Sequence, residues 1–208
     1  MCEPDYATGR LTSGSICATL VLRGVDRAEL GPEMEWTGVR YADRPTVRVE
    51  ALIAAPPERV WELVSDIQLM PELSGELCSV EWLDGATGPA VGNRFLGRNK
   101  HDALGEWETI SYVTECTRPE VFAWAVTDVA NPSSTWRFTV RPEGDGTRLS
   151  QWTQMGPARS GLSGAIDRMP EKEQKIVFVR LRELEASMTA TLAALKQRAE
   201  GAGLAGAR

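Results

Sequence analysis

Apolar and polar residues alternate regularly from about residue 44 onward. Thr46–Ile53 alternates and is rich in β-branched residues, a pattern that is typical of a strand. Two short helices are expected next, because Pro57 suits the first turn of one helix and Asp66 can cap a second. Val60 and Val64 belong to an apolar face of the first helix, which predicts that this helix packs against the rest of the domain.

Six further strand-like runs follow, and residues that favour turns separate them. The runs are Leu77–Leu83, Asn93–Lys100, Glu106–Cys116, Val121–Thr127, Thr135–Arg141 and Arg148–Thr153. Because neighbouring strands joined by short turns run in opposite directions, these runs predict an antiparallel meander.

The last predicted element is a long amphipathic helix that begins near Pro170 and ends at Gly201. Its apolar stripe recurs at spacings of three and four residues: Leu181, Leu184, Met188, Leu192 and Leu195. A sheet with one such helix buries the stripe against one of its faces. The sequence therefore predicts an α+β fold with a seven-stranded antiparallel sheet, two short helices after the first strand and a long C-terminal helix.

The regular patterns divide the chain into three parts. Residues 1–43 have scattered glycine and no sustained periodicity, so we expect a poorly ordered N-terminal extension. Residues 44–200 form the predicted domain, and the Gly/Ala-rich residues 201–208 are expected to be a disordered tail. Met34 opens a stretch that leads directly into the first strand, so translation starting at Met34 and a genuine extension starting at Met1 are both open.

Strand alternation also predicts which side chains share a face of the sheet. If the loop between His101 and Gly105 joins two paired strands, Lys100 lies opposite Glu106 and two opposite-charge pairs fall on one, solvent-facing side. The other side then carries large rings and a few polar groups, and the apolar stripe of the long helix faces it. The predicted inner residues are Phe95, Asn99, Trp107, Thr109, Ser111, Phe122, Trp124, Trp136, Phe138, Gln151 and Thr153, with Leu184 and Met188 from the helix.

This inner face has two interpretations. The rings form an ordinary close-packed core, or they are too large to pack closely and leave a cavity that binds a ligand. Its polar groups hydrogen-bond such a ligand, or they satisfy one another or buried water.

Several short segments carry a resemblance to a known family. They are VEALIAAPPERVWELVSDIQLMPEL, SVEWLDGATGPAVGNRFLGRN, GEWETISYVTEC, FAWAV, WRF and GDGTRL. In this order, over residues 44–200, they resemble the START-like or SRPBCC superfamily, and within it the polyketide cyclase/dehydrase-like branch. The resemblance implies a helix-grip fold, in which a curved sheet wraps around the long helix and leaves an internal pocket for an apolar or amphipathic molecule. Because members of the superfamily include carriers, sensors, cyclases and aromatases, the fold alone does not decide the function.

Composition narrows the chemistry further. The chain has seven Trp but one His, which argues against zinc and non-haem iron sites built from several imidazoles, so no metal and no cofactor are expected. A net charge of -6 argues against nucleic acid as the main partner. No apolar run approaches the length of a membrane span, no signal peptide is evident, and no Cys pair has C-x-x-C spacing, so we expect a cytoplasmic protein. The oligomeric state stays open.

Catalytic groups are scarce on the predicted inner face, which holds no Asp, Lys or Arg. Glu115 lies near a turn and is a candidate to point inward. His101 lies at the mouth of a hairpin and is a weak catalytic candidate, the alternative being a solvated loop histidine.

We therefore expect the chain to bind an apolar or amphipathic small molecule, lipid or polyketide-like, for sequestration or transport. The alternatives are a polyketide cyclase, aromatase or dehydratase, and an interaction or stress-response module with a vestigial pocket. The glycine-rich segment Gly156–Met169 is expected to be either a lid over the pocket or a passive connector.

Overall fold

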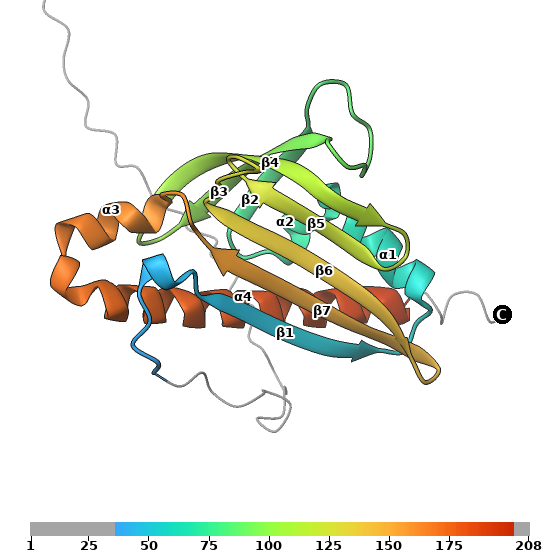
Figure 1. Ribbon diagram of the computed structural model, residues 1–208. Helices are drawn as coiled ribbons and strands as arrows, with labels where there is room; N and C mark the ends of the chain where they lie inside the picture. The colour runs from blue at the N-terminus through green and yellow to red at the C-terminus, as the bar shows by residue number, and fades with distance from the viewer. Residues whose placement is uncertain (1–35, 202–208) are drawn as a thin grey trace, which may run out of the picture. The chain divides into compact units, whose positions relative to one another are not determined.

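A computed structural model of the chain describes residues 36–201 (Figure 1). Its strands are β1 (Thr46–Ile53), β2 (Leu77–Trp82), β3 (Arg94–His101), β4 (Gly105–Thr117), β5 (Val121–Val126), β6 (Ser134–Glu143) and β7 (Gly146–Met155). Its α-helices are α1 (Pro57–Ser65), α2 (Met70–Leu73), α3 (Gly161–Arg168) and α4 (Glu173–Gly201). Short 3₁₀ turns are η1 (Tyr41–Asp43), η2 (Ile67–Leu69) and η3 (Pro170–Lys172).

Within these residues the seven strands form one antiparallel sheet in the order β1-β7-β6-β5-β4-β3-β2. The sheet curves around α4, so that β1 lies along one side of the helix while α2 and β2 lie towards the other (Figure 1). The predicted α+β helix-grip fold is therefore confirmed.

The predicted strand register is also confirmed. Across the β3–β4 hairpin, Lys100 lies opposite Glu106 and Arg98 opposite Glu108, and each pair forms an ion pair on the outer face. Trp124 lies opposite Val113 on one side and Trp136 on the other, as the alternation predicts. All the strand residues of the predicted inner face therefore point to the same side of the sheet.

A bulge in β4 changes the direction of one predicted side chain. The register shifts between Val113 and Glu115, so Thr114 is the extra residue and the positions after it exchange faces. Glu115 consequently points to the outer face, where it forms an ion pair with Arg137. The expectation that Glu115 points inward was wrong.

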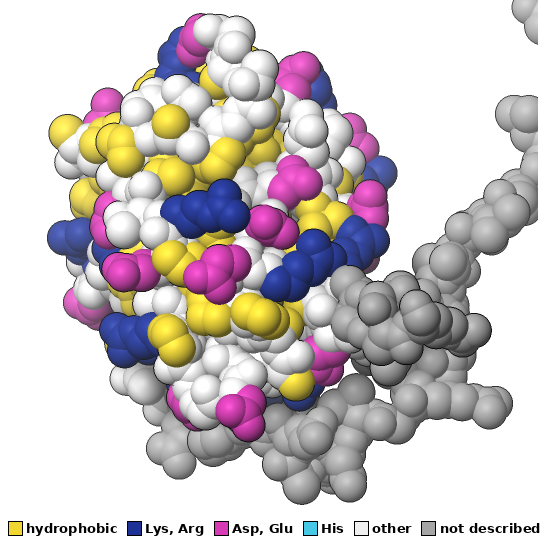
Figure 2. All heavy atoms as spheres, turned by 90° about the vertical axis from the view of Figure 1, so that its right-hand side faces the viewer, with side chains coloured by type: hydrophobic (Ala, Val, Ile, Leu, Met, Phe, Trp, Pro, Cys, Tyr) yellow, Lys and Arg dark blue, Asp and Glu magenta, His cyan; other side chains and the backbone are white. Residues whose placement is uncertain are grey.

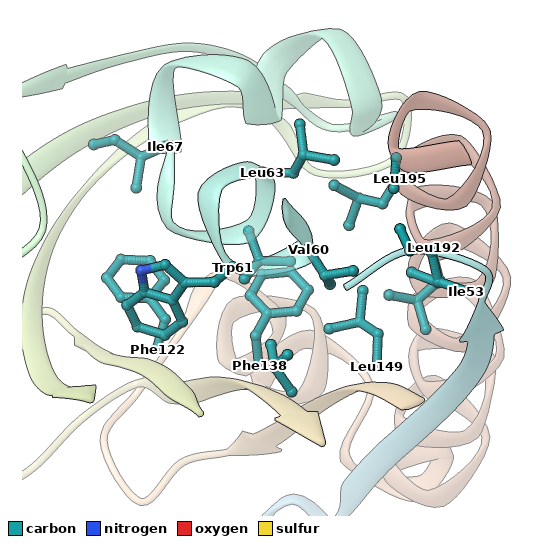
Figure 3. Packing of buried hydrophobic residues seen from close by; sticks show 14 of the residues in the cluster. Ile53, Val60, Trp61, Leu63, Ile67, Phe122, Phe138, Leu149, Leu192 and Leu195 are labelled. Atoms are coloured by element: carbon teal, nitrogen blue, oxygen red, sulfur yellow. The ribbon is translucent and has the colours of Figure 1, made fainter. Parts of the chain in front are cut away.

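The packed core occupies one end of the space between the sheet and α4. Apolar side chains from α1, the sheet and the C-terminal half of α4 meet there (Figure 3). Phe138 and Leu192 are almost fully buried in this cluster, and α1 contributes Trp61, whose ring meets Phe122 edge to face. At the same end the backbone N–H of Ala54 donates to a carboxylate oxygen of Glu200 at 2.8 Å. This hydrogen bond joins the end of β1 to the C-terminal end of α4, beside the close-packed core.

The segment between the last strand and α4 is more regular than expected. The sequence suggested a loop over Gly156–Met169, but α3 occupies Gly161–Arg168. The helix begins after Ser160, whose N–H donates to the Ser163 hydroxyl at 3.1 Å and so satisfies one backbone donor at the helix start. The glycines in this segment favoured the expectation of a loop, whereas the hydrogen bond at Ser160 favours the start of a helix.

Residues 36–43, which the sequence analysis assigned to the extension, contact the domain in the structure. The Tyr41 hydroxyl donates to the carbonyl oxygen of Ala158 at 2.8 Å, and the Trp36 ring packs edge to face against Phe178. Gly201 is the last residue of α4. The expectations for residues 1–35 and 202–208, including the choice between Met1 and Met34, lie outside the described residues.

The surface around the α1 end of the domain is of mixed character. Figure 2 shows acidic and basic side chains intermingled with apolar ones on this face. In the part of the chain that the structure describes, no helix combines the length and the apolar character needed to cross a membrane.

Candidate ligand-binding site

A cavity of about 550 Å³ lies between the inner face of the sheet and α4, beside the packed core. The sheet supplies about half of the lining residues, and α4, the start of α3 and the segments between β1 and β2 supply most of the others. The structure brings all thirteen predicted ligand-binding residues together on this wall: Phe95, Asn99, Trp107, Thr109, Ser111, Phe122, Trp124, Trp136, Phe138, Gln151, Thr153, Leu184 and Met188. That they bind a ligand stays a prediction.

Aromatic rings give the cavity its apolar character, and Trp124 is at their centre. Its ring stacks on Trp136 with centroids 6.2 Å apart and planes 7° from parallel. It also lies about 5–6 Å from the rings of Phe95, Phe122 and Phe138. Phe122 and Phe138 are 1% exposed and belong to the packed core as well as to the wall. Core and cavity are therefore neighbouring parts of one aromatic cluster.

The polar groups of the inner face differ in how well the protein satisfies them. The Thr153 hydroxyl donates to the carbonyl oxygen of Thr135 at 3.1 Å. The Asn99 amide donates, at the long distance of 3.4 Å, to the Thr109 hydroxyl. In contrast, the amide oxygen of Gln151 is buried and has no hydrogen-bond partner among the described residues. Gln151 is thus the inner-face residue with an unmet requirement for a hydrogen bond.

A family model described as "Polyketide cyclase / dehydrase and lipid transport" matches residues 44–200. The chain belongs to this family. The match covers the domain that holds the cavity, and it agrees with the helix-grip architecture and with the resemblance seen in the sequence. A comparison with curated proteins found no match.

Solved structures share the fold. The solution structure of the polyketide-cyclase-like protein Cgl2372 from Corynebacterium glutamicum is 30% identical, with a TM-score of 0.54 over 73% of this chain and 89% of that one. The di-domain aromatase/cyclase StfQ of the steffimycin biosynthetic pathway is 14% identical, with a TM-score of 0.60 over 76% of this chain and 51% of that one. The protein TTHA0849 from Thermus thermophilus is 20% identical, with a TM-score of 0.52 over 76% and 99% of the two chains. The likeness to StfQ and to TTHA0849 shows a shared fold and nothing more.

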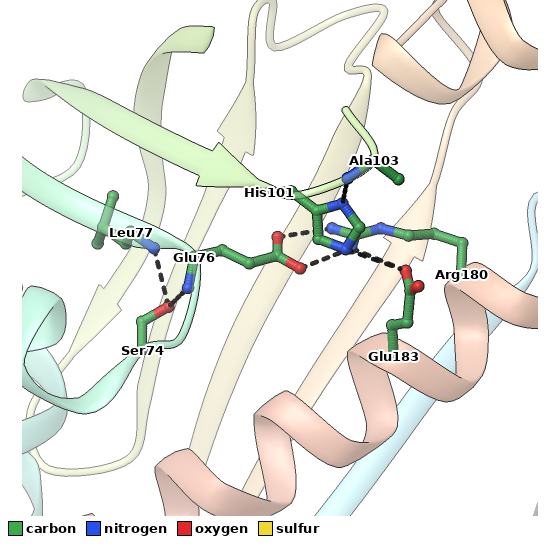
Figure 4. Close-up of polar contacts among 7 residues, drawn as sticks. All are labelled: Ser74, Glu76, Leu77, His101, Ala103, Arg180 and Glu183. Carbon is green, nitrogen blue, oxygen red and sulfur yellow. Dashed lines mark hydrogen bonds and ion pairs between the residues drawn. The ribbon is translucent and has the colours of Figure 1, made fainter. Parts of the chain in front are cut away.

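The wall of this family member also contains charged groups that the sequence analysis missed. Arg180 of α4 and Glu76, just before β2, form a bidentate ion pair with N–O distances of 2.6 and 2.7 Å (Figure 4). Their side chains are 13% and 20% exposed. The Ser74 hydroxyl accepts hydrogen bonds from the N–H groups of Glu76 and Leu77, which fixes the backbone at this point. We call Glu76 and Arg180 the wall ion pair.

Electrostatics favour the charged form of Arg180. Burial by itself would lower the pKa of its guanidinium. The hydrogen bonds and charge of Glu76, aided by those of Glu183, outweigh burial and raise the pKa above its ordinary value. Arg180 precedes Leu184 by four residues and so shares its helical face, a signal that was present in the sequence. Glu76 has no such signal, because it lies in a connection without periodicity.

His101 takes no part in the cavity wall. Its Nδ1 accepts a hydrogen bond from the N–H of Ala103 at 3.2 Å, and its Nε2 lies 3.4 Å from a carboxylate oxygen of Glu183 (Figure 4). The side chain is 18% exposed, so the expectation of a solvated loop histidine was wrong. His101 joins the tip of the β3–β4 hairpin to α4, and its weak candidacy as a catalytic residue stays a prediction.

Part of the segment Gly156–Met169 contributes to the cavity. Ser160, Gly161 and Leu162, at the start of α3, lie on the wall, and so does Arg159. Leu162 is 8% exposed, so α3 is anchored by at least one buried side chain. Whether this segment acts as a lid or as a connector stays a prediction.

Proposed function

We propose that the chain binds an apolar or amphipathic small molecule in the cavity, for sequestration or transport. The observation that carries this proposal is the cavity itself, since protein interiors rarely hold voids larger than a water molecule. At about 550 Å³ the cavity is many times larger than the site of a single water molecule. The volume lies within the range of small-molecule sites, and aromatic walls with a few polar groups are their usual lining.

Flexible and rigid side chains are combined in a way that supports binding. The rings of Trp124 and Trp136 are held by their neighbours on the sheet, so they offer a preformed apolar surface. Met188, 2% exposed, faces them from α4 with a side chain that adapts to different shapes. Burying an apolar ligand here removes its surface from water, which favours binding by about 25 cal/mol for each Å² of apolar surface buried.

The second candidate function is that of a polyketide cyclase, aromatase or dehydratase. The wall ion pair favours it, because carboxylates and cations beside a ligand are the groups that move protons or stabilise enolates. However, Glu76 and Arg180 neutralise each other through two short hydrogen bonds, so neither is free to act as an acid or a base. Binding without turnover is therefore the better supported function.

The binding proposal is tested by filling the cavity. Ser187 lies on the cavity wall, whereas Ala190 is exposed on the same helix. We expect Ser187→Trp to weaken binding of the neutral fluorescent probe N-phenyl-1-naphthylamine at least tenfold, because the indole occupies ligand space. Ala190→Trp, the matched control, should bind the probe like the wild type. Equal affinity in all three folded proteins would contradict binding in this cavity.

Turnover is tested separately with a linear poly-β-ketone. The binding proposal predicts that the ketone is recovered unchanged after incubation with the wild-type chain. Cyclised product that forms with the wild type but not in the absence of the protein would favour the second candidate.

A further inference from the structure

Two uncharged polar side chains, Asn99 of β3 and Thr109 of β4, lie together at one end of the cavity wall. Going along β3, the strand leaves the packed core at Phe95 and reaches Asn99 four residues later. The next residue, Lys100, donates its backbone N–H to the carbonyl oxygen of Glu76 at 2.9 Å. Asn99 and Thr109 are therefore at the end of the cavity where the wall ion pair lies, and we call this the polar end.

The two side chains converge over a residue that has no side chain. Thr109 lies opposite Gly97 in the β3–β4 pair, and Asn99 follows Gly97 on the same face of β3. A methyl group placed on Gly97 would come within 3.4 Å of the Thr109 hydroxyl oxygen and 3.8 Å of the Asn99 amide nitrogen. Asn99 and Thr109 are both partly exposed, so a molecule in the cavity can reach them.

The amide of Asn99 has a defined orientation and a free acceptor. Its nitrogen donates to the carbonyl oxygen of Gly97 at 3.3 Å and to the Thr109 hydroxyl at 3.4 Å. Turning the amide over would place its oxygen against the carbonyl oxygen of Gly97, and two acceptors repel each other. The amide oxygen has no hydrogen-bond partner among the described residues and, unlike that of Gln151, it is not sealed off from the cavity.

The Thr109 hydroxyl supplies the complementary donor. It accepts a hydrogen bond from Asn99, and its own hydrogen is not donated to any group in the part of the chain that the structure describes. One hydroxyl group of a ligand could therefore accept from Thr109 and donate to Asn99 at the same time. A ligand that displaces water from these two groups without replacing the hydrogen bonds of that water loses affinity.

Charge at the polar end favours an uncharged ligand group. Arg180 is neutralised by Glu76 through two short hydrogen bonds. A carboxylate bound here would face the carboxylate of Glu76 and the amide oxygen of Asn99. A cation would face the guanidinium of Arg180. Either one would have to break the wall ion pair or be buried without a counter-ion, and both are costly.

We propose that Asn99 and Thr109 determine ligand specificity by together binding one hydroxyl group of an uncharged, otherwise apolar molecule. Thr109 donates to the oxygen of this hydroxyl, and Asn99 accepts its hydrogen. The apolar body of the ligand then lies against the rings of Trp124 and Trp136. The ligand class is thus a neutral alcohol or phenol whose hydroxyl lies at the polar end. This inference rests on the proposed binding function and adds the chemistry and the orientation of the ligand.

The test compares four ligands that share one ring system. 2-Naphthol both donates and accepts a hydrogen bond, 2-methoxynaphthalene only accepts one, naphthalene does neither, and 2-naphthoate is an anion at pH 7. Their dissociation constants are measured by competition with N-phenyl-1-naphthylamine. We expect the wild type to bind 2-naphthol most tightly and 2-naphthoate at least tenfold more weakly, because the anion has no counter-ion at the polar end.

The variants Thr109→Val and Asn99→Leu separate the two hydrogen bonds. Thr109→Val removes the donor, so the preferences for 2-naphthol and for 2-methoxynaphthalene over naphthalene should both fall. Asn99→Leu removes the acceptor, so only the preference for 2-naphthol should fall. Each fall should be about three- to tenfold, the effect of one uncharged hydrogen bond, and affinity for naphthalene should be kept.

Thr139→Val is the matched control, because Thr139 is on β6, opposite Ser150 on the outer face and outside this cavity wall. It makes the same exchange of a hydroxyl for a methyl group and should leave all preferences unchanged. Thr109→Val keeps the shape of its side chain, so it decides the question even if Asn99→Leu does not fold.

The outcomes separate this inference from the proposed function. Unchanged preferences in the folded variants, or tighter binding of 2-naphthoate than of 2-naphthol by the wild type, would overturn the inference while leaving the binding proposal intact. Failure of the wild type to bind any of the aromatic ligands would overturn the proposed function and this inference with it.

Discussion

The wall ion pair should hold the first half of α4 against the edge of the sheet. Two N–O contacts of 2.6 and 2.7 Å join Arg180 to Glu76, and both side chains are largely shielded from water. With charge centres about 4 Å apart and an effective dielectric constant of about 20, the attraction is roughly 4 kcal/mol. Loss of hydration offsets part of this attraction. Removal of one partner destabilises the fold, because the other charge stays buried without a counter-ion.

A double-mutant cycle with Glu76→Gln, Arg180→Met and the double variant measures this interaction. We expect each single variant to lower the free energy of unfolding by about 2–4 kcal/mol, and the double variant to be no less stable than either. Urea unfolding of the four proteins gives the coupling energy directly. The contact between Arg180 and Glu183 adds little, because the Glu183 side chain is 39% exposed.

The control cycle uses Lys100 and Glu106, which pair on the outer face with side chains 62% and 72% exposed. Water and salt screen this pair, so its coupling should be a few tenths of a kcal/mol. A coupling below about 0.5 kcal/mol for the wall ion pair, equal to that of the control, would refute the argument that burial gives it its strength.

Two further predictions concern stability. Phe138→Ala should lower the free energy of unfolding by about 3–5 kcal/mol in urea, because it empties a fully packed part of the core, and a loss below about 1 kcal/mol would contradict that packing. Asp84 accepts hydrogen bonds from Arg94, which hold its pKa below the ordinary value of 3.8. Its contribution to stability is therefore complete above that value and is lost as the pH falls through the lower pKa of the folded state. Asp84→Asn should make stability fall less steeply with acidification in this range, as measured by thermal unfolding at several pH values, and an unchanged slope would be evidence against the ion pair.

The sheet and its inner face could be predicted because few registers were possible. Pairing Lys100 with Glu106 put two opposite-charge pairs on one face of the β3–β4 hairpin, and period-two alternation carried that choice to Gln151 on β7. The same reasoning could not find the bulge at Thr114, which reverses Glu115, because one extra residue in a strand leaves no periodic signal.

The charged part of the wall depends on tertiary contacts. Arg180 could have been found from its position one turn before Leu184, on the face of α4 that meets the sheet. Its partner Glu76 is 104 residues away in the sequence and lies in an irregular connection. Only the curvature of the sheet around α4 brings the two together. The cavity likewise depends on the distance between the aromatic rings of the sheet and α4. The alternation of residues along the strands does not specify this distance.

Native mass spectrometry of the freshly purified chain tests most directly whether the cavity is a binding site. The cavity volume of about 550 Å³ is within the range of small-molecule sites. We predict a one-to-one complex, with a copurified ligand or with added N-phenyl-1-naphthylamine. It should be lost on denaturation and in Ser187→Trp, and kept in Ala190→Trp. A wild-type chain that stays at its bare mass even with excess probe would contradict the account.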